Sequence, residues 1–394
     1  MQDANAPKTR ALFIINSLAG GGAERVMSTL LTLSGSERDQ FEISLALLDI
    51  EDASYAVPEW IGEHQLDSRR SLLRSIVLLS SLFRRVRPDI GISFLTRANV
   101  ATVLASAACR VPCIISERVN TSSHLGNGLG SWVAKRLVRW TYPRAKRIIA
   151  VSPGVAEDLR ESFAVPKSKI VVVANPVDLA AIERQSREDP VLDLDDPFIV
   201  GMGRLVENKN FGLLIDAFAL SGVGGKLVIL GEGPEREILS RKISELGLAD
   251  RVLMPGFLQN PFAVLRRAKL FVLPSNAEGF PNGLLEAMAL GVPVISTNCC
   301  SGPSEILAAR SRDEIDGPYF AEYGVLVPTE SPELMADALR AMEDRDLRGK
   351  YGEVATARAR MFGAELAKSQ YWEIIKAEIK GARPAPRVRL STPA

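Results

Sequence analysis

Short apolar runs rich in β-branched residues alternate with longer amphipathic stretches along most of the chain. In the first half, the apolar runs have the length and composition of buried strands. They span residues 11–16, 41–48, 89–95, 112–116, 147–152 and 169–176. The stretches between them, such as residues 23–34 and 155–163, repeat apolar residues at helical spacing. Strands joined through helices predict right-handed crossovers and therefore a parallel sheet.

The alternation stops over residues 179–197, which are charged and interrupted by prolines, so we expect a linker there. Five more predicted strands follow, at residues 198–205, 226–233, 251–257, 269–275 and 292–297. Residues 1–178 and 198–362 thus predict two doubly wound, Rossmann-like α/β domains with parallel sheets that face a central cleft. We expect residues 363–380 to form a C-terminal helix that packs back on the N-terminal domain. Residues 381–394 have the composition of a disordered tail.

Cysteine and histidine usage argues against a metal site or a disulfide framework. The four cysteines lack paired zinc spacing, and the chain has only two histidines, His64 and His124. The N-terminus lacks the arrangement of a signal peptide. The longest strongly apolar stretch, residues 75–83, is far shorter than the ~20 residues that a membrane-spanning helix needs. We therefore expect an intracellular, reduced protein.

Three segments at predicted strand ends carry candidate chemistry. The first, SLAGGGAERV at residues 17–26, places Gly21 and Gly22 before a helix, whose N-terminus can bind an anion. A tight strand-to-helix turn explains this segment equally well. The second, GMGRLVENKN at residues 201–210, places Arg204 and Lys209 beside another helix start. A guanidinium fork and an ammonium there suit a diphosphate, although a solvated basic loop is an equal alternative.

The third segment, NAEGFPNGLLEAMALGVPVIS, follows a predicted strand that ends at residue 275. We expect Asn282 to cap a helix that Gly291 terminates. Glu278 then lies in the loop at the carboxyl end of the sheet, and Glu286 lies on the helix behind it. Each carboxylate can accept two hydrogen bonds from a polyhydroxylated ligand. The alternative is a capping carboxylate followed by an exposed helical glutamate.

These motifs together resemble glycosyltransferase family 4, which has the GT-B fold of two Rossmann-like domains around a cleft. The resemblance rests on GGGAER, GRLVENKN, LGEGPERE and EGFPNGLLEAMALGVPVIS, and extends from residue 11 to about residue 380. The two glutamates eight residues apart are its most specific part, and the glycine loop is its least specific part. INSLAGGGAERV and the ISER at residues 115–118 are most similar to bacterial members that build lipid-linked glycans.

The resemblance implies a role for each matching residue. Arg204 and Lys209 would hold the donor diphosphate, and Glu278 would bind the transferred sugar, so these three are the predicted catalytic residues. Glu286 would bind the ribose hydroxyls. The full set implied to bind the nucleotide sugar is Gly203, Arg204, Lys209, Gly231, Glu232, Gly233, Phe257, Glu278, Gly279, Phe280, Pro281 and Glu286.

The N-terminal domain would bind the acceptor. The resemblance places acceptor or phosphate contacts at Gly21 and Gly22 and at Glu117 and Arg118, which end a predicted strand. An exposed Glu–Arg pair is the alternative for the latter two. The sequence departs from the family here, because it lacks a histidine that some relatives carry in this region.

The family transfers sugars with retention of configuration, without a metal or another cofactor. The resemblance therefore implies transfer of a hexose or N-acetylhexosamine from a nucleotide diphosphate sugar, with UDP favoured over GDP, to a lipid-linked saccharide in bacterial surface glycan synthesis. Alternative functions are a sugar-nucleotide epimerase, an NAD-dependent dehydrogenase and a non-catalytic nucleotide-sugar-binding protein. The missing spaced-glycine fingerprint disfavours the dehydrogenase. The sequence does not indicate an oligomeric state.

Two basic stretches give the first domain its charge. Residues 1–178 carry 22 Lys and Arg against 17 Asp and Glu, a net of +5. Residues 68–88 and 132–147 each contain six cations and no acid, and the second also contains two tryptophans. Such a surface favours an anionic bilayer, and no nucleic-acid recognition motif accompanies the charge. The predicted membrane residues are Arg84, Arg85, Lys135, Arg136 and Arg139.

We accordingly expect a cytoplasmic protein that is peripheral at the inner face of the cell membrane. An apolar stripe within residues 68–88 has helical spacing, and we expect it to accompany the cations. This stripe consists of Leu72, Ile76, Leu79, Phe83 and Val86. The alternative is that both stretches are ordinary packing helices with solvated ends.

Overall fold

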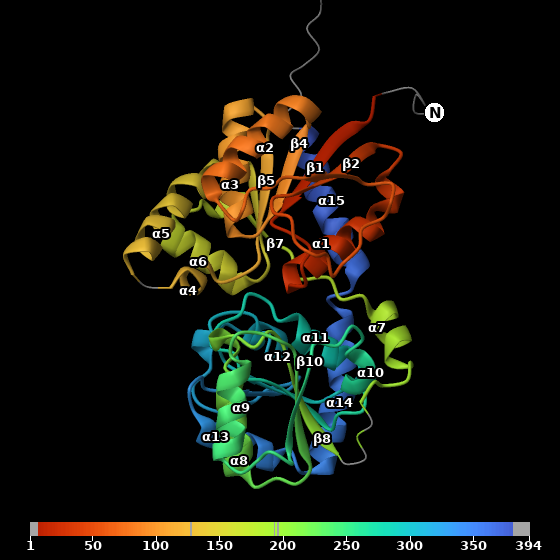
Figure 1. The fold of residues 1–394 in the computed structure, drawn as a ribbon, viewed down its shortest axis with the longest axis vertical. Coiled ribbons are helices and arrows are strands. Elements are labelled where there is room, and N and C mark those ends of the chain that lie inside the picture. The colour runs from red at the N-terminus through yellow and green to blue at the C-terminus, as the bar shows by residue number, and fades with distance from the viewer. Residues whose placement is uncertain (1–6, 127, 193, 195–196, 381–394) are drawn as a thin grey trace, which may run out of the picture.

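The computed structural model describes residues 7–126, 128–192, 194 and 197–380, and these form two α/β units, each around a seven-stranded sheet (Figure 1). The strand orders are β3-β2-β1-β4-β5-β6-β7 and β10-β9-β8-β11-β12-β14-β13. Both orders reverse direction beside their first strand in sequence, as in a doubly wound fold. This arrangement confirms the predicted GT-B fold class.

The first sheet is parallel throughout the pairings that the structure describes. Its strands are β1 Thr9–Ile15, β2 Phe41–Leu47, β3 Gly62–Gln65, β4 Ile90–Phe94, β5 Cys113–Glu117, β6 Arg147–Ala150 and β7 Ile170–Val172. The pattern of apolar runs did not predict β3. Its sequence is GEHQ, and it is largely exposed at the edge of the sheet, so it carries no hydrophobic signal.

Helices cover both faces of the first sheet. They are α1 Gly22–Leu33, α2 Leu72–Val86, α3 Thr96–Cys109, α4 Thr121–Leu125, α5 Leu129–Thr141 and α6 Pro153–Phe163, with 3-10 turns at Ser34–Glu37, Tyr142–Arg144 and Lys167–Lys169. α2 packs against α3, and α3 packs against α5, so α2 and α5 flank α3 on one face. α1 packs against the C-terminal helix on the other face (Figure 1).

The second sheet is parallel except for the antiparallel pair β13–β14. Its strands are β8 Phe198–Met202, β9 Lys226–Leu230, β10 Val252–Gly256, β11 Leu270–Leu273, β12 Val294–Thr297, β13 Tyr319–Phe320 and β14 Val325–Val327. β13 and β14 were not predicted, because they have only two and three residues. The helices are α7 Leu179–Ser186, α8 Phe211–Ser221, α9 Arg236–Glu245, α10 Phe262–Leu265, α11 Asn282–Ala289, α12 Pro303–Leu307, α13 Pro332–Ala341 and α14 Arg345–Arg360, with 3-10 turns η4 Glu207–Lys209 and η5 Arg312–Glu314.

The chain passes between the two units twice. In the first passage, α7 packs against α10, and the Asn260 side chain donates a hydrogen bond of 2.8 Å to the Gln185 carbonyl. The first part of the predicted linker, residues 179–197, is thus a helix attached to the second unit rather than free chain. The second passage lies beside the first, where Val177 and Gly363 form an isolated parallel bridge.

After this second passage, α15 Ala364–Lys380 packs on the first unit. The Trp372 indole nitrogen donates to Ser34 Oγ at 2.8 Å, and its ring lies 4.7 Å from the Phe41 ring centroid. Burying such a ring contributes several kcal/mol by its area alone, roughly 150–250 Å² at ~25 cal/mol per Å². α15 therefore anchors the C-terminal end of the described chain on the N-terminal unit. The predicted tail, residues 381–394, lies outside the described residues.

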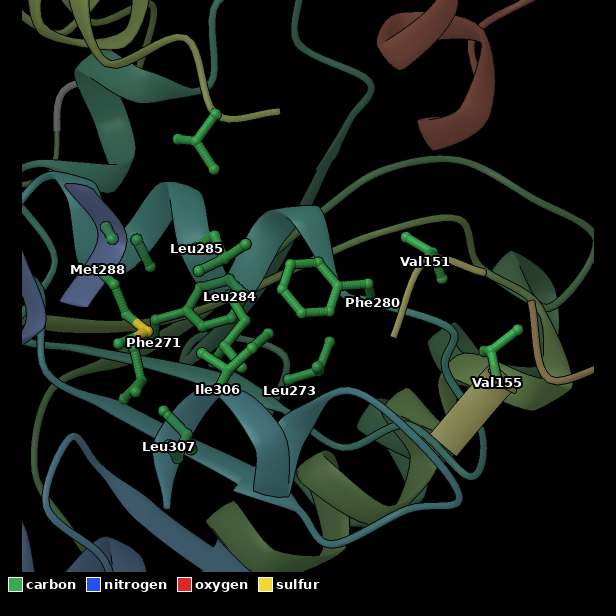
Figure 2. Packing of buried hydrophobic residues seen from close by; sticks show 14 of the residues in the cluster. Val151, Val155, Phe271, Leu273, Phe280, Leu284, Leu285, Met288, Ile306 and Leu307 are labelled. Carbon is green, nitrogen blue, oxygen red and sulfur yellow. The ribbon is translucent and has the colours of Figure 1, made fainter. Parts of the chain in front are cut away.

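One hydrophobic cluster extends across the boundary between the units (Figure 2). The buried face of α11, including Leu284, Leu285 and Met288, packs on the core of the second sheet. Val151 and Val155 of the first unit belong to the same cluster. α11 is therefore fixed from behind by apolar packing, which holds its polar residues in a defined position.

Candidate active site

The carboxyl ends of β8, β9 and β10 meet at a surface that admits only glycine at two positions. A Cβ atom on Gly231, whose φ is +143°, would lie 1.9 Å from the Gly203 carbonyl oxygen. A Cβ atom on Gly233 would lie 2.3 Å from the Leu205 oxygen. The missing side chains let the loop after β9 pack directly against the backbone of the loop after β8. The exposed ring of Phe257 borders this surface.

Glu232 lies between those two glycines and points away from them. Its carboxylate forms an ion pair of 2.8 Å with Arg236, the first residue of α9. Its carbonyl accepts a hydrogen bond from the backbone of Leu205, which ties the β9 loop to the β8 loop. The backbone of Glu232 therefore shapes the surface, whereas its side chain is half exposed.

The loop after β8 presents two cations. Arg204 is exposed, and Lys209 extends over Gly203, where an added Cβ would lie 3.5 Å from Lys209 Cδ. Lys209 Nζ is 2.5 Å from Glu278 Oε1, so this loop meets the loop after β11. Two further side-chain hydrogen bonds join these loops, from Asn208 and Asn210. The structure thus brings the three predicted catalytic residues onto two bonded loops.

Glu278 is held on two sides. Ser275 Oγ donates to its carboxylate at 2.6 Å, and Ser301 Oγ donates to its carbonyl at 2.6 Å. Next to it, Gly279 touches the first unit, because an added Cβ would lie 2.1 Å from the Arg118 carbonyl oxygen. The Phe280 ring is buried in the core, so only its backbone faces the site.

α11 begins one residue earlier than the sequence predicts. Pro281, not Asn282, is the N-cap, and no side chain caps this helix. The Asn282 side chain instead reaches across to the first unit, where it accepts from Asn175 at 2.6 Å and donates to the Gly22 carbonyl at 3.3 Å. The prediction of Asn282 as a cap is wrong, because these contacts with the other unit engage its amide.

Glu286 is buried, with 6% of its surface exposed, so the alternative of an exposed helical glutamate is wrong. Its Oε1 atom is 2.6 Å from Nη2 of Arg25 on α1 of the opposite unit. Its Oε2 atom is buried and has no hydrogen-bond partner among the described residues. Burial raises the pKa of Glu286, and the charge of Arg25 opposes that rise.

The glycine loop lies opposite the donor-side loops. Gly21 is the N-cap of α1 and offers no capping side chain, and an added Cβ on Gly22 would lie 3.1 Å from the Asn282 amide nitrogen. Glu24, in the first turn of α1, is near enough to Arg204 for that charge to affect its titration. Burial raises the pKa of Glu24, while its own backbone hydrogen bond and Arg204 oppose the rise.

Glu117 is fully buried at the end of β5, so it is not part of the exposed pair that the sequence also allowed. Its carboxylate accepts hydrogen bonds from the Tyr142 hydroxyl, from Thr96 Oγ1 at 3.3 Å and from the Arg118 backbone at 3.1 Å. Burial raises the pKa of Glu117 to about 6.

The Arg118 side chain is also buried, and it links three parts of the chain. Its guanidinium donates to the Tyr371 hydroxyl of α15 at 2.7 Å and to the Asn175 amide oxygen. Asn175 in turn donates to the Phe280 carbonyl at 2.8 Å. Arg118 therefore holds the C-terminal helix and the loop of Glu278 together, and this use explains its burial.

Sequence reasoning gave no role to Arg25, Asn175, Tyr371 or Glu305. Glu305 Oε1 accepts from the Gly154 backbone at 2.5 Å and so caps α6 of the opposite unit. A signal existed for Arg25, which lies in the quoted glycine motif. The other three contact residues far away in sequence, and no spacing could have indicated those partners.

The predicted membrane residues lie on α2 and α5, which flank α3 on one face of the first unit (Figure 1). The predicted apolar stripe of α2 does not face solvent, because Leu79 and Phe83 are buried in the core. The exposed apolar residues are others: Leu73 and Val77 on α2, and Trp132, Val133 and Trp140 on α5. No helix in the described part of the chain is long and apolar enough to cross a bilayer.

The fold and the site define a two-domain enzyme of the glycosyltransferase class, and comparison with known proteins agrees. Residues 13–176 match the family described as glycosyl transferase 4-like domain, and residues 182–358 match glycosyl transferases group 1. The chain is 33% identical over 360 residues to the N-acetylgalactosamine-N,N'-diacetylbacillosaminyl-diphospho-undecaprenol 4-alpha-N-acetylgalactosaminyltransferase of Campylobacter jejuni, covering 88% of this chain and 94% of that protein. This chain belongs to glycosyltransferase family 4.

Two more distant matches cover nearly the whole chain. A second Campylobacter jejuni enzyme, a GalNAc-alpha-(1->4)-GalNAc-alpha-(1->3)-diNAcBac-PP-undecaprenol alpha-1,4-N-acetyl-D-galactosaminyltransferase, is 25% identical and covers 94% of this chain and 99% of its own. The crystal structure of HepE from Anabaena in complex with UDP superimposes with a TM-score of 0.74 at 21% identity, over 94% of this chain and 100% of that chain. The latter likeness shows the fold.

Proposed function

We propose that this enzyme is a retaining, metal-independent glycosyltransferase. It moves a hexose or N-acetylhexosamine from a UDP-sugar to a lipid-linked saccharide in the synthesis of a bacterial surface glycan. The observation that carries the proposal is the ion pair of Lys209 with Glu278 on two bonded loops of the second unit, together with Glu286 of α11 held by Arg25 of the first unit. The Campylobacter relatives are named as transferases that act on undecaprenol-linked saccharides, and this supports the acceptor class.

Two cations suit the departing diphosphate. Breaking the bond between sugar and diphosphate develops negative charge on the phosphates and positive character on the sugar. Arg204 and Lys209 would stabilise the phosphate charge as it grows, which lowers the barrier rather than only the ground state. Lys209 is held at Glu278, so its position is set before the donor arrives.

Glu278 would contact the transferred sugar, beside backbone N–H groups of Gly279 and Phe280 that are suited to the distal phosphate. Glu286 would accept the ribose hydroxyls at its unpartnered Oε2 atom. The glycine-lined surface at Gly231 and Gly233 would border the base together with Phe257.

The acceptor would approach from the first unit. Gly21 and Gly22 offer backbone at the start of α1, where an anionic acceptor group is favoured. Glu117 and Arg118 lie behind this surface and are engaged in buried hydrogen bonds. We therefore propose that these two residues support the acceptor side of the site through their buried hydrogen bonds. Thr96, two residues after the end of β4, donates one of these bonds to Glu117.

The basic face of α2 and α5 would hold the enzyme at the cytoplasmic side of the membrane. Arg84 and Arg85 are exposed on α2, and Arg136 stacks over the exposed Trp132 ring at 4.9 Å on α5. Exposed tryptophan beside arginine suits the interface of an anionic bilayer. The attraction would weaken as salt rises, because the Debye length is only about 8 Å near physiological ionic strength.

This surface is tested by flotation with vesicles of anionic or neutral lipid. Wild type should float with anionic vesicles and detach as salt is raised. Charge reversal at Lys135 and Arg136 should abolish flotation and leave circular dichroism and transfer to a water-soluble acceptor intact. A wild type that ignores anionic vesicles contradicts the membrane proposal without affecting the donor site.

The donor class is tested by thermal unfolding in the presence of UDP, GDP and a panel of UDP-sugars. A ligand that binds only the native state adds about 2.7 kcal/mol to the free energy of unfolding at one hundred times its Kd. The melting temperature rises accordingly. We expect UDP and at least one UDP-sugar to protect wild type. Protection by GDP alone would overturn the choice of base, and protection by no nucleotide would overturn the proposed donor site.

A further inference from the structure

Glu286, the carboxylate proposed to bind the donor ribose, is paired with a residue of the opposite domain. Arg25 Nη2 contacts Glu286 Oε1 at 2.6 Å, and the two side chains are 32% and 7% exposed. Arg25 follows Gly21 and Gly22 in the first turn of α1, so the glycine loop fixes its position. Glu286 comes from α11, in the second domain. Contact between them therefore requires that the two domains be closed on each other.

Glu286 retains an unused binding capacity in this closed arrangement. Its Oε2 atom is buried and has no partner among the described residues. A buried carboxylate oxygen without a hydrogen bond is costly, and such atoms are rare in native proteins. Arg25 engages Oε1, so the lone pairs of Oε2 can accept hydrogen bonds from a hydroxyl group. The arrangement fits a carboxylate that is oriented by Arg25 and waits for a hydroxyl-bearing ligand.

Other residues of the same two elements also meet across this boundary. The Asn282 amide, at the start of α11, donates to the Gly22 carbonyl at 3.3 Å. Tyr55 of the first domain lies near Arg25 and Glu286, since both charges act on its hydroxyl. The contact of Arg25 with Glu286 thus belongs to a continuous polar boundary rather than to an isolated surface pair.

We infer that Arg25 is a positioning residue of the donor site, which orients Glu286 from the N-terminal domain and thereby couples ribose binding to domain closure. This inference rests on the proposed binding of ribose by Glu286. A hydroxyl group that donates to Oε2 stabilises the ionised form of Glu286. The ionised carboxylate in turn strengthens the contact with Arg25. By linkage, a nucleotide that engages Oε2 favours closure, and closure favours that nucleotide to the same degree.

The test uses the full-length protein and isothermal titration calorimetry with UDP and 2′-deoxy-UDP as probes. The variants are Arg25→Met, Arg25→Lys, Glu286→Gln and the double variant of Arg25→Met with Glu286→Gln. The matched control is Arg241→Met, which alters an exposed arginine of α9. Small-angle scattering with saturating UDP reports the radius of gyration, and circular dichroism confirms folding.

We expect Arg25→Met to weaken UDP binding about tenfold or more, as loss of a charge-assisted hydrogen bond does. It should also reduce the preference for UDP over 2′-deoxy-UDP and enlarge the UDP-bound particle. Arg25→Lys should restore part of the affinity, and the double variant should lose no more than Glu286→Gln alone, because the residues act as a unit. In turnover, Arg25→Met should raise KM for the donor more than it lowers kcat.

Two results separate the inference from the proposed function on which it rests. If Glu286→Gln weakens UDP binding but Arg25→Met leaves affinity, sugar preference and compactness at the level of Arg241→Met, the inference is wrong and the ribose assignment stands. If Glu286→Gln itself leaves UDP binding unchanged, the ribose assignment is wrong, and the inference falls with it. Equal effects of Arg25→Met on UDP and 2′-deoxy-UDP would also overturn the coupling through ribose.

Discussion

Substitution of Gly279 by alanine should block domain closure without unfolding either domain. The added Cβ would lie 2.1 Å from the Arg118 carbonyl oxygen and 2.9 Å from Val119 Cα, and ordinary contact begins at about 3.4 Å. Both clashing groups are backbone, so no side chain can turn aside. The loop of Glu278 and the end of β5 must therefore separate by more than about 1 Å. This shift would move Glu278 away from the first domain.

A displacement of that size in a reacting geometry can cost roughly a hundredfold in rate. We therefore expect Gly279→Ala to lower kcat/KM for sugar transfer by about two orders of magnitude, measured with a UDP-sugar and a lipid-linked acceptor. Thermal unfolding of the variant should stay close to wild type, because the substitution lies at the boundary between the domains.

Gly349→Ala is the matched control for this substitution. Gly349 lies within α14, and an added Cβ there would meet nothing within 4 Å. It should leave transfer unchanged and raise stability by up to about 1 kcal/mol, since alanine is the better helix former. Wild-type turnover by Gly279→Ala would contradict this expectation, because it would show that the closed arrangement is not the one in which transfer occurs.

Three further predictions concern single side chains. Arg204→Ala or Lys209→Ala should lower transfer a hundredfold or more, equivalent to roughly 2.7 kcal/mol of lost transition-state stabilisation, and wild-type turnover in both would exclude the diphosphate role. Glu286→Ala should weaken UDP binding in calorimetry, whereas Glu278→Ala should spare UDP and impair binding of the whole UDP-sugar; equal losses of UDP affinity would contradict this division. Burial raises the pKa of Glu117 to about 6 from an ordinary 4.5, so the folded state binds the proton more tightly and this group lowers stability as pH rises through that interval. Glu117→Gln should therefore remove a fall of up to about 2 kcal/mol in the free energy of unfolding between pH ~4.5 and ~6, measured by urea titration, and an unchanged pH profile would contradict it.

The central strands were predictable from the sequence because they are buried on both faces. The continuously apolar residues 11–15 and 270–273, within the predicted runs 11–16 and 269–275, lie in β1 and β11. The edge strand β3 is polar, and β13 has only two residues, so neither gives a periodic signal. The helix α7 was missed for a different reason. It is short and charged, and its stability comes from packing on α10 rather than from its own pattern.

The candidate site was predictable within each domain and not between the domains. Strand ends and glycine spacing indicated Arg204, Lys209 and Glu278, which lie on two bonded loops of one sheet. The pairing of Glu286 with Arg25 depends on how the two domains sit against each other. Local periodicity reports which residues are buried, and it carries no information on which distant residue covers them.

The central claim is tested most directly by incubating the enzyme with UDP-sugars and an undecaprenol-diphosphate-linked saccharide and measuring the lipid product by mass spectrometry and NMR. We expect a lipid product heavier by one hexose or N-acetylhexosamine, formed with retained anomeric configuration in the presence of EDTA, and lost in Lys209→Ala. Release of free sugar or an epimerised UDP-sugar without a lipid product, or a product of inverted configuration, would contradict it.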